Sequence, residues 1–430
     1  MKKNVAIYLI TAILNKMIPF LLLPILTKYL SPAEYGVIAI YTTLITFATP
    51  LIGINLQGNI SRNFYKESKE KVAKIISNIF IILFGSFILF EIFTGVYIHI
   101  FKTMFDIPPY WLLMIPVIVL FQMIREFNLT IIRNNRQAII YGIYQIVATL
   151  VEILMVFYLI ICLHKGWEGR ANAILIASLI FGIIGFTHTY KTGYFKPNFN
   201  KDTIKTLLKV SIPLIFYSIG GIIINMSDRF FIDRMLGKEM LGIYAVGYSF
   251  GMMISILTNA FNKDWSAWIY REFAHITEER KREIVKITYL YSLSLIVLAI
   301  LSNFASYILI HFMTNERYHS GKEFIIWVSL SYAVNGMNQL FFPYFNQVGK
   351  TKRIAVISFI SAIINIIFTY ILIKANGAVG AAQATLISFI FLLLVSWWSA
   401  QKIYPMPWNL LDKSFIKKDL QVTENPEKIN

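Results

Sequence analysis

The sequence predicts an all-α polytopic membrane protein, with twelve transmembrane helices in two six-helix lobes related by a pseudo-twofold axis along the membrane normal. Composition is the first observation behind this prediction: 57% of the 430 residues are hydrophobic and 15% are charged, with a mean hydropathy of +0.62. The apolar residues also gather in runs long enough to cross a membrane. Finally, parts of the first half of the chain recur in the second half.

Twelve apolar runs are each about 20 residues long, the length that a helix rising about 1.5 Å per residue needs to cross about 30 Å of hydrocarbon. They lie near residues 4–29, 36–58, 75–99, 111–131, 138–162, 171–190, 209–232, 240–261, 285–310, 323–345, 354–374 and 380–400. The first run follows Met1-Lys2-Lys3 and continues past Ile18 without a small-residue cleavage signature. We therefore interpret it as an uncleaved first helix rather than a signal peptide.

The basic residues predict the orientation of these helices. With a cytoplasmic N-terminus, 28 of the 40 lysine and arginine residues lie in cytoplasmic segments, nine in outer turns and three within spans. This asymmetry is the positive-inside pattern, and it places both termini in the cytoplasm. The net charge of +17 therefore reflects topology, and we expect no binding to nucleic acid.

Several classes of protein are disfavoured. The loops between the spans are too short to hold a folded soluble domain, which argues against most enzymes. The single cysteine, Cys162, excludes an intrachain disulfide and a cysteine metal cluster. The six histidines form no His-Glu-x-x-His motif. We expect neither catalytic activity nor a bound metal or cofactor.

The two halves of the chain share matched motifs. At an offset of 206 residues, Lys28-x-Leu30-x5-Gly36-x2-Ala39 matches Arg234-x-Leu236-x5-Gly242-x2-Ala245. At an offset of 211, Gly166-x2-Gly169-x-Ala171-x-Ala173 matches Gly377-x2-Gly380-x-Ala382-x-Ala384. Two such offsets indicate a duplicated six-helix unit, and because six is even, both copies start on the same side of the membrane. We predict lobes over residues 1–195 and 196–405, followed by a cytoplasmic tail over 406–430.

The opening of the chain resembles a known family. Its motif is Pro19-x4-Pro24-Ile25-Leu26-Thr27-Lys28-Tyr29-Leu30-Ser31-Pro32-x-Glu34-Tyr35-Gly36. Further landmarks are Arg62-Asn63-Phe64-Tyr65 and Ser227-Asp228-Arg229-Phe230-Phe231-Ile232. These residues are similar to those of the Wzx-type flippases for lipid-linked oligosaccharides, which belong to the multidrug/oligosaccharidyl-lipid/polysaccharide exporter superfamily.

The resemblance implies a carrier in the bacterial cytoplasmic membrane. Such a protein moves undecaprenyl-pyrophosphate-linked oligosaccharide repeat units to the outer leaflet by alternating access, for O-antigen or capsule synthesis. The resemblance also implies coupling to an H⁺ or Na⁺ gradient. The implied partners are the lipid-linked oligosaccharide, membrane lipids, and the polymerase and glycosyltransferases of the same pathway.

Three basic residues within the spans are candidates for binding an anionic substrate: Lys16, Arg125 and Arg229. A charge inside a bilayer persists where it faces protein or water. Lys16 should face a cavity near the midplane, although a lysine that snorkels to the interface is the alternative. Consecutive helical residues point about 100° apart, so we expect Arg229 to face the pyrophosphate and Asp228 to face a neighbouring helix. The alternative is a structural pair.

Carboxylates within the spans are candidates for ion coupling. Arg125 and Glu152 lie on adjacent predicted helices and could neutralise each other. Alternatively, Glu152 loads and releases a cation or proton, because burial favours the protonated form of a carboxyl. Glu91 and Asp228 are further candidates for that role. Three prolines are candidate hinges: Pro19, Pro24 and Pro213.

Two other functions remain open on the sequence. A cation-coupled multidrug antiporter of the same superfamily would share the helix count and the repeat, but its cavity should be less cationic. The three basic residues within the spans argue against it. A membrane-bound glycan polymerase or acyltransferase would need a large outer loop or an outer cluster of catalytic histidine and aspartate residues, and we find neither.

Overall fold

The computed structural model describes residues 11, 20, 22–101, 106–274, 276–348 and 350–409. Within these residues every regular element is a helix, which confirms the predicted all-α class. The α-helices are α2 (Leu23–Tyr29), α3 (Pro32–Gly53), α4 (Gln57–Phe64), α5 (Lys69–Phe101), α6 (Pro109–Asn134), α7 (Ala138–Val156), α8 (Gly166–Lys191), α9 (Lys201–Leu236), α10 (Lys238–Gly251), α11 (Ile254–Ala274), α12 (Glu278–Met313), α13 (Lys322–Gln339), α14 (Phe342–Gln347) and α15 (Thr351–Ile403). A π-helix, η1 (Phe157–Cys162), extends α7, and a 3₁₀ helix, η2 (Glu316–Gly321), precedes α13.

Part of the opening motif acts as the start signal of α3. Pro32 occupies the first position of the helix, where a missing N–H costs nothing. The Ser31 hydroxyl accepts the backbone N–H of Glu34, and the Glu34 carboxylate accepts the backbone N–H of Ser31 at 2.9 Å. This reciprocal capping box fixes where the helix begins.

The predicted spans overlap the observed helices. Among the described residues, eight helices are long and apolar enough to cross a membrane, and α10 with α11, bent by 43°, can count as a ninth. The 53-residue α15 is too long for one crossing and breaks at Gly377 (φ 60°, ψ −145°), between the predicted spans 354–374 and 380–400. The span 323–345 is divided into α13 and α14, and most of span 4–29 lies outside the described residues. The helices are consistent with twelve crossings.

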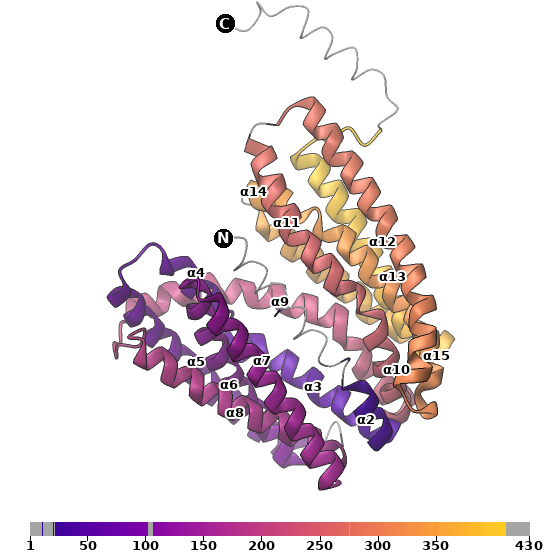
Figure 1. Cartoon of the computed structure of the whole chain (residues 1–430). Helices are drawn as coiled ribbons and strands as arrows, with labels where there is room; N and C mark the ends of the chain where they lie inside the picture. Colours follow the sequence, from indigo (N-terminus) through magenta and orange to yellow (C-terminus); the bar gives the residue numbers. More distant parts are fainter. Residues whose placement is uncertain are drawn as a thin grey trace, which may run out of the picture.

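The helices form two lobes, as predicted (Figure 1). One contains α3 to α8 and the other contains α10 to α15. The lobes meet where α3 packs against α10, and they diverge toward α4 on one side and toward α11 and α14 on the other. The predicted boundaries at residues 195 and 405 remain predictions.

The contact between α3 and α10 is reciprocal. A Cβ on Gly36 would lie 2.0 Å from the carbonyl oxygen of Lys238, and a Cβ on Gly242 would lie 1.8 Å from the carbonyl oxygen of Pro32. The 206-residue repeat relates Gly36 to Gly242 and Pro32 to Lys238. Each half therefore makes the same contact with the other, as two copies do across a twofold axis. Only glycine allows the two backbones to approach so closely.

Helix α9 connects the lobes and is bonded to both. On the side of the first lobe, Asn59 donates to the Ser211 hydroxyl at 2.7 Å, and Asn55 donates to the Ser218 hydroxyl at 3.1 Å. On the other side, the Ser227 hydroxyl donates to the Asn365 side-chain oxygen in α15 at 2.9 Å. These bonds pin α9 between the two lobes.

Candidate functional site

A polar cavity of about 490 Å³ lies where α3, α6, α7 and α8 of the first lobe face α9, and we call it the central cavity. It is bordered by the middle part of α3. Seven of its lining residues carry hydroxyl or amide side chains: Thr42, Thr46, Thr49, Asn55, Gln122, Ser178 and Ser218. A cavity of this kind offers a polar ligand the hydrogen-bond partners that hydrocarbon lacks.

Three charged side chains line the central cavity: Arg125, Glu152 and Arg170. Arg170 and Glu152 form an ion pair with 2.8 Å between Nη1 and Oε1, and both side chains are partly buried. Arg125 donates to the side-chain oxygen of Gln145 on α7. The cavity wall therefore carries two cations and one anion.

The pairing predicted from the sequence is wrong in one respect. Glu152 is paired with Arg170 rather than with Arg125, because the first turn of α8 brings Arg170 beside α7. Arg170 is one of the nine basic residues that the predicted topology places in outer turns, so its position in the cavity wall was not predicted. The glycine motif that starts at Gly166 was the available signal, because it marks the first turn of the helix that carries Arg170.

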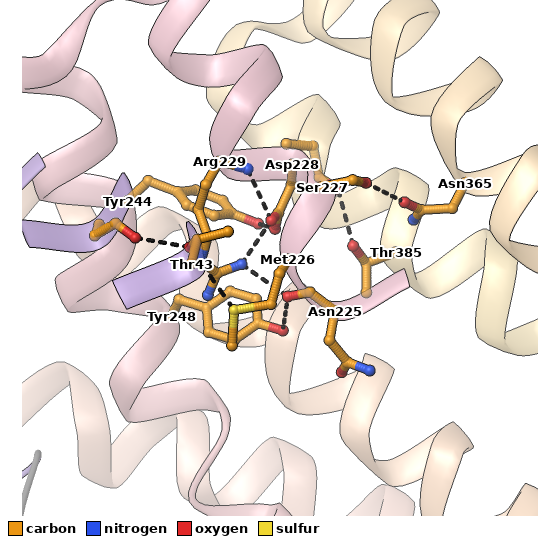
Figure 2. A network of polar contacts seen from close by, with 12 residues as sticks. Thr43, Asn225, Met226, Ser227, Asp228, Arg229, Tyr244, Tyr248, Asn365 and Thr385 are labelled. Carbon is orange, nitrogen blue, oxygen red and sulfur yellow. Dashed lines mark hydrogen bonds and ion pairs between the residues drawn. The ribbon is translucent and has the colours of Figure 1, made fainter. Parts of the chain in front are cut away.

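Asp228 and Arg229 form a second charged cluster, buried where α9 packs against α10 and α15 (Figure 2). Their side chains form an ion pair at 2.5 Å. The preferred expectation, that the two side chains point apart, is therefore wrong, and the pair that the sequence left as the alternative is present. Arg229 also donates to the backbone carbonyl of Asn225 at 2.8 Å, so its long side chain lies along the preceding turn and reaches Asp228. The Cα–Cβ bonds of Asp228 and Arg229 point apart, but the Arg229 side chain is long enough for its guanidinium to turn back toward Asp228.

The two charges of this cluster are enclosed by aromatic side chains. The Tyr244 hydroxyl donates to Asp228 at 2.5 Å, and the Arg229 guanidinium lies 4.1 Å from the ring centroid of Tyr248 (Figure 2). A buried cation and anion that neutralise each other and are further hydrogen-bonded form a structural unit. Neither Asp228 nor Arg229 lines the central cavity, so their predicted roles in substrate binding and ion coupling remain predictions.

The other candidates are dispersed. Lys16 and Pro19 lie outside the described residues. Glu91 lies on α5, away from the central cavity, and one of its carboxylate oxygens is buried without a hydrogen-bond partner among the described residues. Pro24 stands at the start of α2, and Pro213 lies inside α9. The predicted hinges are thus at a helix start and within the connecting helix, and their hinge role remains a prediction.

Comparison with known sequences shows relatives over most of the chain. Residues 1–264 match the model of the family described as "Polysaccharide biosynthesis protein", and residues 213–371 match that of the family described as "MatE". An "Uncharacterized membrane protein" of Haemophilus influenzae is 25% identical over 84% of this chain and 88% of its own. "Capsular polysaccharide biosynthesis protein CapF" of Staphylococcus aureus is 23% identical over 94% of this chain and all of its own.

Solved structures share the fold at low sequence identity. The inward closed conformation of the lipid II flippase MurJ aligns with a TM-score of 0.71 and 16% identity, over 93% of this chain and 87% of that one. The inward-facing conformation of a multidrug resistance MATE family transporter aligns with a TM-score of 0.68 and 13% identity, over 90% and 95%. Both are membrane transporters. The family match covers more than half of the sequence, and the chain therefore belongs to the polysaccharide biosynthesis protein family.

Proposed function

We propose that the protein is a flippase that moves undecaprenyl-pyrophosphate-linked oligosaccharide repeat units from the cytoplasmic to the outer leaflet of the bacterial cytoplasmic membrane. It works by alternating access, as a carrier and not as an enzyme. The observation that carries this proposal is the central cavity, in which Arg125 and Arg170 stand among hydroxyl and amide groups. The family match and the capsular polysaccharide relative support the same function.

The chemistry of the cavity suits such a substrate. A pyrophosphate with attached sugars cannot enter hydrocarbon without losing its hydrogen bonds to water. Guanidinium groups bind phosphate oxygens through paired, charge-assisted hydrogen bonds. The hydroxyl and amide groups of Thr46, Gln122 and Ser178 can bond the sugar hydroxyls in place of water. The lipid tail does not need to leave the membrane.

The orientation inferred from the basic residues indicates to which side of the membrane the two lobes are open. The starts of α3 and α10 lie on the outer side in that orientation, so their glycine contact closes the outer side of the protein. The lobes diverge on the opposite, cytoplasmic side, where α4 and α11 end (Figure 1). This corresponds to an inward-facing carrier. It would receive its substrate from the leaflet in which lipid-linked sugars are assembled.

The charged residues of the cavity receive separate roles. Arg125 and Arg170 bind the pyrophosphate, and Lys16 is expected to add a third positive charge. Glu152 is the preferred residue for coupling to H⁺ or Na⁺, because its carboxylate neutralises Arg170 before the substrate arrives. Glu91 and Asp228 are the further candidates for ion coupling. We also expect the carrier to work beside the polymerase and glycosyltransferases of its pathway.

Complementation tests this function. The chain is expressed in a bacterial strain that lacks its own sugar-lipid flippase, and both the surface glycan and the inner-leaflet pool of lipid-linked repeat units are measured. Restored glycan with a drained pool is the expected result. An unchanged pool in a strain that supplies the matching repeat unit, with confirmed membrane insertion, would contradict the proposal.

A cation-coupled multidrug antiporter is the second candidate, favoured by the MatE match over residues 213–371. It would bind hydrophobic cations, which two arginines in the cavity repel. Resistance of the same cells to cationic dyes, without restored glycan, would favour this function.

A further inference from the structure

A second charged cavity, of about 470 Å³, lies between the two ends of α15, far along the chain from the central cavity. We call it the basic groove. Its lining includes Lys352 and Arg353 from the first turns of α15, Val356 and Ile357 from the turn that follows, and Trp398 and Lys402 from the end of the same helix. The break at Gly377 folds α15 back on itself, which allows its first and last turns to line one cavity.

The basic groove has an uncompensated positive charge. Three of the residues that line it are cationic, and among the described lining residues none is acidic. The ion pairs found among the described residues involve none of these three cations. The Lys402 ammonium lies 3.5 Å from the ring centroid of Trp398, which holds the cation at the edge of the groove.

The start of α15 adds to this positive field. Its N-cap residue, Lys350, offers no side-chain hydrogen bond to the first turn. The backbone N–H groups of a helix start carry a partial positive charge and favour an anion. Phosphate is an anion that suits both the helix start and the neighbouring ammonium and guanidinium groups.

The groove is also amphipathic. The apolar side chains of Val356 and Ile357 lie one turn deeper along α15 than Lys352 and Arg353. Trp398 lines the same groove, and tryptophan is enriched at the membrane–water interface. A ligand that fits would join a negative headgroup to a hydrocarbon chain.

We propose that the basic groove binds an anionic phospholipid of the cytoplasmic leaflet, with its phosphate among Lys352, Arg353 and Lys402. This assignment rests on the proposed topology, in which both ends of α15 face the cytoplasm. Lys352 also lines an adjoining cavity of about 310 Å³ with Pro213 of α9 and Phe342 of α14. The bound headgroup therefore lies beside the packing of α9 against α15, which joins the connecting helix to the second lobe.

The test measures lipid binding to the purified full-length protein in a neutral detergent. Phosphatidylglycerol and phosphatidylcholine with the same acyl chains are titrated, and bound lipid is counted by native mass spectrometry. We expect saturable binding of phosphatidylglycerol alone. Lys352→Gln/Arg353→Gln/Lys402→Gln should weaken it roughly 100-fold, since each basic side chain at a membrane surface contributes about a factor of five.

Two control variants make the test specific. Lys201→Gln/Lys205→Gln/Lys209→Gln removes the same charge from the exposed start of α9 and should bind like the wild type. Lys352→Arg/Arg353→Lys/Lys402→Arg keeps the charge and should retain most of the binding, which excludes misfolding as the cause of a loss. Equal binding of both lipids, or equal losses in the two glutamine variants, would overturn the proposal.

A third lipid separates the phospholipid from the transported substrate. If undecaprenyl phosphate bound the basic groove more tightly than phosphatidylglycerol, and the triple glutamine variant lost that preference, the phospholipid assignment would be overturned. The experiment does not measure transport. Its failure is therefore distinct from a failure to restore surface glycan.

Discussion

Glu152 of α7 and Arg170 of α8 form an ion pair in the wall of the central cavity, with 2.8 Å between Oε1 and Nη1. The carboxylate neutralises one of the two arginines of that wall, and among the described residues that line the cavity Glu152 is the one acidic side chain. An arriving pyrophosphate would compete with Glu152 for Arg170. The two members of the pair should therefore affect anion binding in opposite directions.

Substitution of this pair tests the competition. Arg170→Gln should weaken binding of pyrophosphate to the purified protein about tenfold, and Glu152→Gln should strengthen it by a similar factor. Isothermal titration with inorganic pyrophosphate measures both. Equal effects of the same sign would contradict the proposed competition.

Loss of Arg125 should reduce glycan export more than it reduces stability. Arg125→Ala removes a cavity cation whose neutral partner, Gln145, can rebind water. We expect a drop of at least about tenfold in the rate at which the lipid-linked pool drains, because a charge-assisted bond to phosphate contributes roughly 1.5–3 kcal/mol. Lys281→Ala, which breaks a partly exposed pair with Glu278, is the control and should change little.

Arg229→Ala should instead destabilise the fold. The substitution leaves Asp228 buried without its cation, a change that costs roughly 3–5 kcal/mol. Tyr244→Phe removes one hydrogen bond to the same carboxylate and should cost about 1–3 kcal/mol. Thermal unfolding in detergent ranks the two variants. An Arg229→Ala protein as stable as the wild type, but unable to export glycan, would return Arg229 to the substrate site.

Gly242→Ala should separate the lobes on the outer side. The added Cβ meets the Pro32 carbonyl oxygen, and because main-chain atoms cannot rotate away, we expect a loss of about 1–3 kcal/mol. Accessibility of the central cavity from outside measures this separation. Thr42→Cys is introduced together with Cys162→Ser, which removes the native cysteine. A membrane-impermeant thiol reagent added outside should label position 42 when Gly242→Ala is present and not when Gly242 is retained.

The matched control for this substitution is Gly221→Ala in α9. A Cβ at Gly221 would meet no neighbouring atom within 4 Å, so the protein should remain folded and closed. If position 42 were labelled equally in the Gly242→Ala and Gly221→Ala proteins, the glycine contact would not be what closes the outer side.

The sequence predicted the spans because long apolar runs have few alternatives in a membrane. The repeat pairs Gly36 with Gly242 in the sequence, but the contact of these two glycines between the lobes was learned only from the structure. The sequence did not predict the partner of Glu152, because residues were assigned to the membrane from the predicted span 171–190, and Arg170 lies one residue before that span although it belongs to α8. The Asp228–Arg229 pair stood only as the alternative on the sequence, because the spacing of helical residues does not show that a long, flexible side chain can bend back along its own helix.

The reciprocity of Gly36 and Gly242 limits how the two halves of the chain can diverge. A larger side chain at either glycine would meet the main chain of the other half, and no side-chain replacement there removes a carbonyl oxygen. A second substitution near this contact therefore cannot relieve the clash that a larger residue at Gly36 or Gly242 would cause. Suppressors selected from an impaired Gly242→Ala strain should consequently be true revertants, or should lie at distant positions that change the angle between the lobes.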